Sequence, residues 1–118
     1  MKRVYSLKSK DVIDSIFKAK TSVGNSYFAI YYQKHEDIHF KYSISIGKKY
    51  GSAVERNLAK RRLRYILSKF KDELKQDVSF VIVVKPSVNT LKYNDILENI
   101  KKLLIKARFI EKEEQTNA

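Results

Sequence analysis

The segment of residues 78–84 constrains the fold more than any other part of the chain. It reads VSFVIVV, consists almost entirely of apolar residues, and is bounded by Asp77 and Pro86. A strand that is covered on both faces has this composition, whereas a strand with one face in water alternates between apolar and polar residues. We therefore expect a strand here with both of its faces covered.

Hydrophobic periodicity predicts two further strands and three helices around that strand. The strands are expected at residues 27–33, which are rich in aromatics, and at 39–46, where apolar and polar residues alternate. The helices are expected at residues 11–20, 53–71 and 93–108. The order is therefore helix, two or three strands, helix, strand, helix.

The connecting segments leave one point open. We interpret residues 21–26, which contain Gly24 and Asn25, as a turn, whereas residues 35–38 fit either a turn or a further strand. The 118 residues carry no internal repeat or linker, so we expect a single domain over residues 1–118. Within it, residues 1–8 are expected to form a loosely ordered arm and residues 111–118 a disordered tail.

The charge balance points to a polyanionic partner. The chain has 25 Lys and Arg against 13 Asp and Glu, a formal net charge of +12, which favours nucleic acid or an anionic membrane surface. No apolar run approaches the ~20 residues of a membrane span, and polar residues interrupt the N-terminus, so no secretory signal is expected. The chain has no cysteine, and we expect a cytoplasmic protein without a membrane partner.

Much of the positive charge is gathered in residues 47–65, which read GKKYGSAVERNLAKRRLRY. Ser52 is placed to cap a helix, and the 3.6-residue period puts Arg56, Lys60 and Arg64 on one stripe with Asn57 and Arg61 at its edge. A solvated charged face is the alternative interpretation, but such faces usually mix both signs. We therefore expect a basic helix surface that binds a polyanion.

The sequence shows no motif that indicates a catalytic site. His35 and His39 lie in a predicted turn and strand, where we expect exposed histidines rather than a metal site. The neighbouring acids Glu36–Asp37, Asp72–Glu73 and Glu111/Glu113/Glu114 fall in predicted loops or the tail. No Ser lies in a nucleophile elbow, and residues 47–52 do not follow the P-loop order. We expect binding chemistry and no catalytic residue in this chain.

The basic stretch resembles the motif of the bacterial ribonuclease P protein family. The resemblance runs through Lys48-Lys49-x-Gly51-x-Ala53-Val54-x-Arg56-Asn57-x-x-Lys60-Arg61-x-x-Arg64, and extends over roughly residues 5–108 through the predicted strands and the last helix. It implies an α+β fold, a small α/β sandwich of the ribosomal protein S5 domain 2 type with element order α-β-β-β-α-β-α. It also implies a left-handed βαβ crossover, which is an exception to the usual hand.

The resemblance further implies a function in tRNA maturation. Proteins of this family bind a large catalytic RNA, which uses Mg²⁺ to remove the 5′ leader from precursor tRNA. The catalytic chemistry then belongs to the RNA. The implied partners are the catalytic RNA and precursor tRNA, with no organic cofactor and no obligate protein partner.

Two sets of binding residues follow from the resemblance. The residues that match the family's RNA-binding motif are Lys48, Lys49, Arg56, Asn57, Lys60, Arg61 and Arg64. The residues that match the leader-binding cleft are Ile13, Phe17, Tyr31 and Ser45. For Phe17 and Tyr31 the alternative is simple core packing; as aromatics they also suit stacking on unpaired bases.

Three positions depart from the family pattern. Leu58 stands where many members carry a further cation, Ile13 where Phe is common, and Lys20 where Gly often follows the Phe-Lys pair. Two other functions remain open from the sequence. One is a free-standing basic RNA-binding or ribosome-associated protein; the other is a nuclease in its own right, which lacks an acidic cluster for Mg²⁺.

Overall fold

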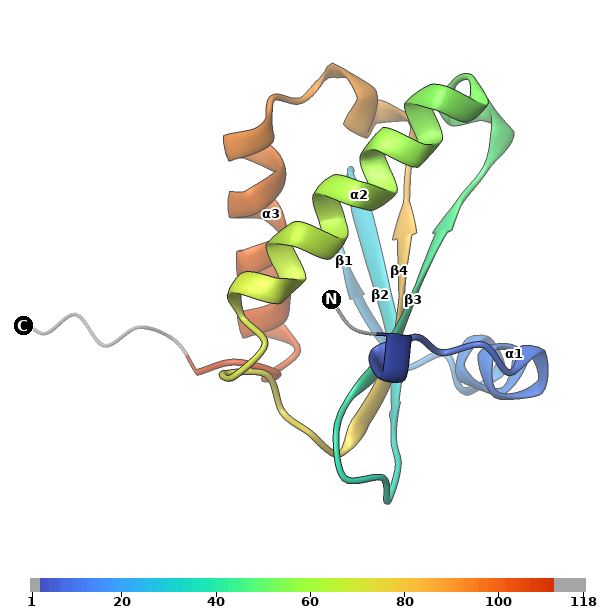
Figure 1. Cartoon of the computed structure of the whole chain (residues 1–118), viewed down its shortest axis with the longest axis vertical. Helices are drawn as coiled ribbons and strands as arrows, with labels where there is room; N and C mark the ends of the chain where they lie inside the picture. The colour runs from blue at the N-terminus through green and yellow to red at the C-terminus, as the bar shows by residue number, and fades with distance from the viewer. Residues whose placement is uncertain (1–2, 112–118) are drawn as a thin grey trace, which may run out of the picture.

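The computed structural model describes residues 3–111. Within them, three α-helices pack on one four-stranded sheet, as Figure 1 shows. The helices are α1 (Lys10–Ala19), α2 (Ala53–Lys69) and α3 (Tyr93–Lys106). The strands are β1 (Ser22–Gly24), β2 (Phe28–Lys34), β3 (Lys41–Ile46) and β4 (Val78–Val84). Short 3-10 helices lie at Arg3–Tyr5, Lys48–Tyr50 and Pro86–Thr90.

The sheet is mixed, with strand order β1-β2-β4-β3. β4 pairs antiparallel with β2, where Tyr31 lies opposite Val81, and parallel with β3, where Ser43 lies opposite Val81. β4 is therefore flanked on both sides, and five of its seven residues from Val78 to Ile82 are buried in succession. This confirms the expectation of a strand with both faces covered.

α2 connects the parallel neighbours β3 and β4 by a left-handed crossover. Both strands run upward in Figure 1, and the chain passes in front of the sheet through α2 from β3 on the right to β4 on its left. The predicted fold class, element order and hand of the crossover are thereby confirmed.

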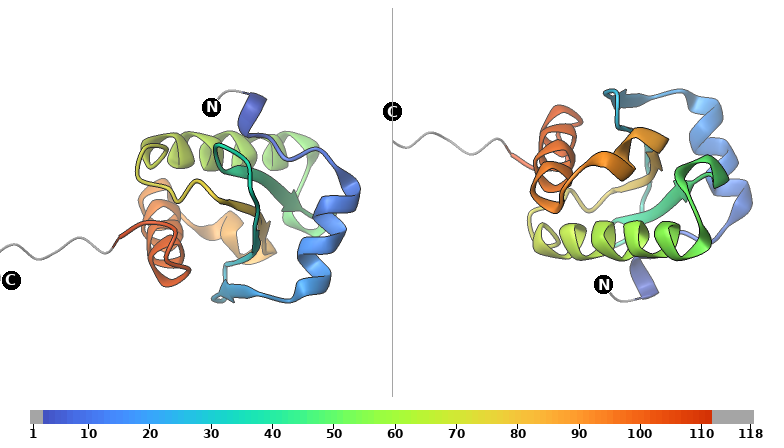
Figure 2. Two further views of the ribbon diagram at one scale, coloured as in Figure 1. Left: turned by 90° about the horizontal axis from the view of Figure 1, so that it is seen from below. Right: turned by 90° about the horizontal axis from the view of Figure 1, so that it is seen from above.

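The helices divide between the two faces of the sheet, which Figure 2 shows from both ends. α2 and α3 cover one face and enclose the larger core, which includes Phe28, Phe80 and Ile100. α1 covers the other face, where Ile16 packs with Leu7 and Val81 in a smaller cluster. The two inner strands, β2 and β4, therefore contribute side chains to both apolar clusters, through Tyr31 and Val81 on the side of α1.

Two expectations about local structure are wrong. Residues 22–24, predicted as part of a turn, form β1 and pair with β2, because the Asn25 side chain accepts hydrogen bonds from the backbone N–H of Tyr27 and Phe28 and closes a hairpin. The segment 35–38 is a turn, so β1 is the additional strand. The predicted loose arm is ordered at residues 3–7, where Ser6 bridges to Tyr42 and Leu7 is buried.

The remaining expectations concern the chain ends and membrane insertion. Residues 1–2 of the predicted arm and residues 112–118 of the predicted tail lie outside the described residues. Among residues 3–111, no helix has the length and apolar character that a membrane crossing requires.

Candidate nucleic-acid interface

The start of α2 is fixed by reciprocal hydrogen bonds between Ser52 and Glu55. The Glu55 backbone N–H donates to Ser52 Oγ at 3.2 Å, and the Ser52 backbone N–H donates to Glu55 Oε1 at 3.1 Å. These bonds hold the pKa of Glu55 below its usual value. The single acidic residue at this end of the helix is thereby engaged with the backbone.

The loop before α2 presents two lysines to solvent. Lys48 and Lys49 are exposed, whereas the next residue, Tyr50, is buried and its backbone carbonyl accepts a hydrogen bond from Asn89 Nδ2 at 3.1 Å. Gly51 has φ 158°, a conformation that other residues rarely adopt, and a Cβ atom there would lie 2.9 Å from the Glu55 carboxylate and displace it from its bond to Ser52, so glycine is favoured where the loop meets the helix. Tyr50 and Gly51 thus anchor the loop while both ammonium groups remain free to bind.

Arg56, Lys60 and Arg64 form the predicted stripe along α2. They follow at intervals of four residues, and the adjacent side of the helix is buried through Ala59, Leu63, Ile66 and Leu67. Arg56 Nη1 donates to the Gly51 carbonyl at 2.9 Å, which ties its guanidinium to the loop and leaves its other donors available.

Lys60 and Arg64 also line a groove of about 250 Å³ beside β3. Its other wall is the N-terminal segment Ser6, Leu7 and Lys8, which pairs with Tyr42 through the backbone. Burial raises the pKa of the Tyr42 hydroxyl, and the positive charge of Arg64 partly offsets this effect. The groove therefore combines three cations, Lys8, Lys60 and Arg64, with the outer strand of the sheet.

Asn57 and Arg61 complete this side of the helix and are both exposed. We call the following seven residues the basic surface: Lys48, Lys49, Arg56, Asn57, Lys60, Arg61 and Arg64. Within residues 3–111, none of its cations forms an ion pair with an acidic side chain; the ion pairs found are Lys41–Asp37 and Lys75–Asp77. An unneutralised row of cations on a rigid helix is suited to binding phosphates.

Other residues of α2 lie beside the basic surface. Val54, Leu58 and Tyr65 are exposed rather than part of the core. Leu58 is 41% exposed. Arg62 is half-buried, and its positive charge partly offsets the rise that burial causes in the pKa of Tyr50.

A second group of candidate residues lies on the opposite face of the sheet. Ile13, Phe17 and Tyr31 are half-buried and pack around the cluster of Leu7, Ile16 and Val81. The Phe17 and Tyr31 rings meet edge to face, with centroids 5.0 Å apart. We call Ile13, Phe17 and Tyr31 the aromatic cluster, after its two rings. Both rings are partly accessible to solvent, and both also help to pack α1 against the sheet.

Ser45 lies on the same face of the sheet but on the outer strand β3. It pairs in register with Val83, and its side chain is exposed. Ser43, two residues earlier, lies opposite Val81 and is half-buried. The structure therefore brings Ile13, Phe17 and Tyr31 together and places Ser45 at the edge of the same face.

The two histidines are half-buried, so the expectation that they are exposed is wrong. His35 Nδ1 lies 2.6 Å from Ser79 Oγ, and His35 Nε2 lies 3.0 Å from the carbonyl oxygens of both His39 and Gln76. Because a carbonyl only accepts, Nε2 carries the proton. His35 thus ties the β2–β3 turn to β4. No group of three or more His, Asp or Glu residues within 3–111 is placed to hold a metal ion.

One protein family matches most of this chain. The family model described as Ribonuclease P matches residues 1–108. The ribonuclease P protein component of Acholeplasma laidlawii is 63% identical over 115 residues, which cover 98% of this chain and 99% of the relative. The chain belongs to the bacterial ribonuclease P protein family. A second family member, from Phytoplasma australiense, is 41% identical over 93% of this chain and 96% of its own.

Solved structures of ribonuclease P proteins have the same fold. The Staphylococcus aureus protein aligns with a TM-score of 0.85 at 26% identity, over 91% of this chain and 98% of its own. The Thermotoga maritima protein aligns with a TM-score of 0.78 at 23% identity, over 86% and 96% of the two chains.

One part of the basic side of this ribonuclease P protein was missed by the sequence reasoning. Ser6, Leu7 and Lys8 form a wall of the groove that holds Lys60 and Arg64. The sequence contained one signal, an isolated apolar Leu7 within a basic segment, but a single apolar residue has no periodicity. The bridge between Ser6 and Tyr42 and the hydrogen bond from the Leu7 N–H to the Tyr42 carbonyl show that this segment lies against β3.

Proposed function

We propose that this chain is the protein subunit of ribonuclease P and assists endonucleolytic removal of the 5′ leader from precursor tRNA. The observation that carries the proposal is the unpaired row of Arg56, Lys60 and Arg64 on α2, in a chain that matches the ribonuclease P family over residues 1–108. The cations would bind phosphates of the catalytic RNA, since a rigid helix is suited to a folded RNA.

The aromatic cluster would bind the leader in the same complex. A single-stranded leader exposes its bases, and each base stacked on an aromatic ring contributes about 1–3 kcal/mol. Phe17 and Tyr31 are partly accessible and lie on the face of the sheet opposite α2. One rigid sheet would therefore hold the leader on one side and the catalytic RNA on the other.

Mg²⁺ in this proposal belongs to the RNA partner. A hard divalent cation prefers several carboxylate or carbonyl oxygens, and residues 3–111 offer no group of three acidic or histidine side chains for one. We therefore assign the chain no step in bond cleavage. Its own contribution is to hold the two RNAs in place and to offset repulsion between their phosphates.

The direct experiment reconstitutes cleavage. Precursor tRNA is incubated with the catalytic RNA of the same organism at low Mg²⁺, with and without the protein. We expect faster cleavage and tighter precursor binding with the protein present. Unchanged rate and affinity would contradict the proposal and favour a free-standing RNA-binding protein, whereas cleavage by the protein alone would make it a nuclease in its own right.

A further inference from the structure

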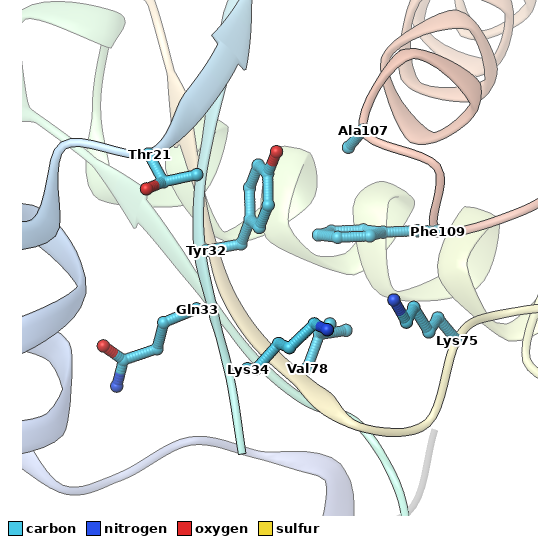
Figure 3. A pocket seen from close by; sticks show the side chains of 8 residues that line it. All are labelled: Thr21, Tyr32, Gln33, Lys34, Lys75, Val78, Ala107 and Phe109. Atoms are coloured by element: carbon cyan, nitrogen blue, oxygen red, sulfur yellow. The ribbon is translucent and has the colours of Figure 1, made fainter.

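A separate pocket lies away from both the basic surface and the aromatic cluster. Figure 3 shows it between the end of β2 and the segment that follows α3. Its volume is about 350 Å³, and its lining residues are Thr21, Tyr32, Gln33, Lys34, Lys75, Val78, Ala107 and Phe109. None of these residues belongs to the two candidate sites described above.

The apolar wall of the pocket is rigid. The Tyr32 and Phe109 rings meet edge to face, with centroids 4.9 Å apart and planes at 83°. Phe109 is only 2% exposed, its N–H donates to the Leu104 carbonyl at 2.9 Å, and its own carbonyl accepts from the Lys75 N–H at 2.7 Å. The pocket exists because β1 is short: Tyr32 still pairs with Thr21, but the edge of β2 is uncovered beyond that point.

The polar wall of the pocket is positively charged. Lys34 and Lys75 both line it, and in Figure 3 their ammonium groups point toward each other beside the Phe109 ring. Among residues 3–111, none of those that line the pocket is acidic. Lys75 lies 4.0 Å from Asp77 with both side chains more than 40% exposed, which is a weak ion pair. The site therefore offers two cations beside an aromatic surface.

We propose that this pocket binds one unpaired nucleotide of an RNA. The base would lie against the half-buried Tyr32 ring, which is supported from behind by the buried Phe109 ring, and its phosphate would lie between Lys34 and Lys75. The pocket volume is at the lower end of the range for small-ligand sites, about 300–1,000 Å³, which suits a single nucleotide rather than a longer segment. An aromatic wall next to paired cations is also the combination that single-stranded nucleic-acid sites use. The inference rests on the proposed function in one respect, that the chain binds RNA.

The test follows amide NMR shifts of the full-length protein during titration with adenosine 5′-monophosphate, adenosine and inorganic phosphate. We expect the nucleotide to shift the amides of Tyr32, Val78, Ala107 and Phe109, and to bind at least about fivefold more tightly than adenosine or phosphate alone. A nucleotide that also binds the basic surface gives a second set of shifts on α2 with its own dissociation constant.

Paired variants separate the pocket from general charge. The double variant Lys34→Gln/Lys75→Gln should weaken nucleotide binding at the pocket by about fivefold, as expected for two partly exposed cations. The control Lys92→Gln/Lys102→Gln removes the same charge from exposed lysines outside the pocket, and we expect binding there to stay unchanged. Equal weakening in both variants would overturn the proposal.

Three further results would also overturn the proposal. They are equal affinity for phosphate and nucleotide, shifts confined to α2, and tighter binding of an acidic peptide at the same amides. The reconstituted cleavage assay judges the proposed function independently. If the protein stimulates cleavage but the pocket amides do not respond to nucleotide, the pocket assignment alone fails.

Discussion

At the scale of single residues, Arg56 and Arg64 differ although both lie on the same stripe of α2. Arg56 is half-buried and donates to the Gly51 carbonyl, so it supports the loop before the helix as well as carrying charge. Arg64 is exposed and makes no such bond within residues 3–111. Substitution of the two residues should therefore separate RNA contact from loop stability.

Arg64→Ala should weaken binding to the catalytic RNA and flatten the log–log dependence of affinity on salt by about one unit, as one phosphate contact is lost. Arg56→Ala should do the same and also lower the free energy of unfolding by about 1 kcal/mol. Binding across a salt series and urea unfolding measure these effects. Lys102→Ala on α3 is the matched control, and an unchanged slope in Arg64→Ala would place that side chain away from the RNA.

Phe17→Leu tests whether the aromatic cluster binds a base or only packs α1. Leucine keeps most of the apolar contact with Tyr31 but removes the ring. We expect the preference for a long-leader precursor over a leaderless substrate to fall about tenfold, within the range for one stacked base. Affinities of the two substrates for the reconstituted complex measure this, and equal losses for both would instead indicate damage to the packing of α1.

At the scale of elements, the end of α1 carries a residue that does not suit its backbone. Lys20 caps the helix in the left-handed region with φ 56°, and its N–H donates to the Phe17 carbonyl at 3.3 Å. A side chain in this conformation costs free energy that glycine avoids. A preference for Gly at this position, which the family resemblance implies, would thus have a backbone explanation, and Lys20 adopts this cap geometry at a cost.

Lys20→Gly should raise the free energy of unfolding by about 0.5–1 kcal/mol, because glycine adopts the left-handed conformation without strain. Thermal or urea unfolding measures the change. Lys18→Gly, two residues earlier in the helical part of α1, is the control and should destabilise the protein, since glycine is unfavourable within a helix. A loss of stability in Lys20→Gly would mean that the lysine side chain stabilises this turn.

At the scale of the whole molecule, the larger core couples stability to alkaline pH through Tyr42. Tyr42 is only 4% exposed, and this burial raises the pKa of its hydroxyl above the ordinary value of 10.0. The unfolded chain therefore loses this proton at a lower pH than the folded protein does. The contribution of the protonated Tyr42 hydroxyl to the free energy of unfolding is complete below pH 10. It is lost as pH rises through the pKa that Tyr42 has in the folded protein.

Tyr42→Phe removes this titration. We expect the free energy of unfolding of the variant to decline less steeply than that of the wild type above pH 10. Urea unfolding at a series of pH values between 8 and 11 measures the difference between the two proteins. Parallel declines would show that Tyr42 titrates equally in the folded and unfolded states.

The fold could be predicted where a segment carries its own periodicity. Alternation in β3 and the apolar run of β4 were sufficient for those strands, and the i, i+4 spacing of Arg56, Lys60 and Arg64 located the charged side of α2. β1 was missed because three residues, Ser22, Val23 and Gly24, cannot display a pattern, and the strand depends on its partner.

Features made by several segments could not be predicted from the residues. The hand of the crossover came from family resemblance, since periodicity does not encode the direction in which a helix crosses a sheet. The nucleotide pocket joins Tyr32 on β2 to Phe109 beyond α3, and the groove beside β3 joins Leu7 to Lys60. Both depend on tertiary contacts between segments more than 50 residues apart in the chain.

Side chains along β3 point alternately to the two faces of the sheet, and this alternation limits where the chain can gain or lose residues. Tyr42 faces the larger core while Ser43 and Ser45 face the side of α1, and the strand leads within two residues into Lys48. One inserted residue would exchange the two faces of the strand and rotate the lysine loop with it. The exposed turn around Ile38, which is 90% exposed, lies outside this constraint. Insertions and deletions should therefore accumulate at that turn and be excluded from the six residues of β3.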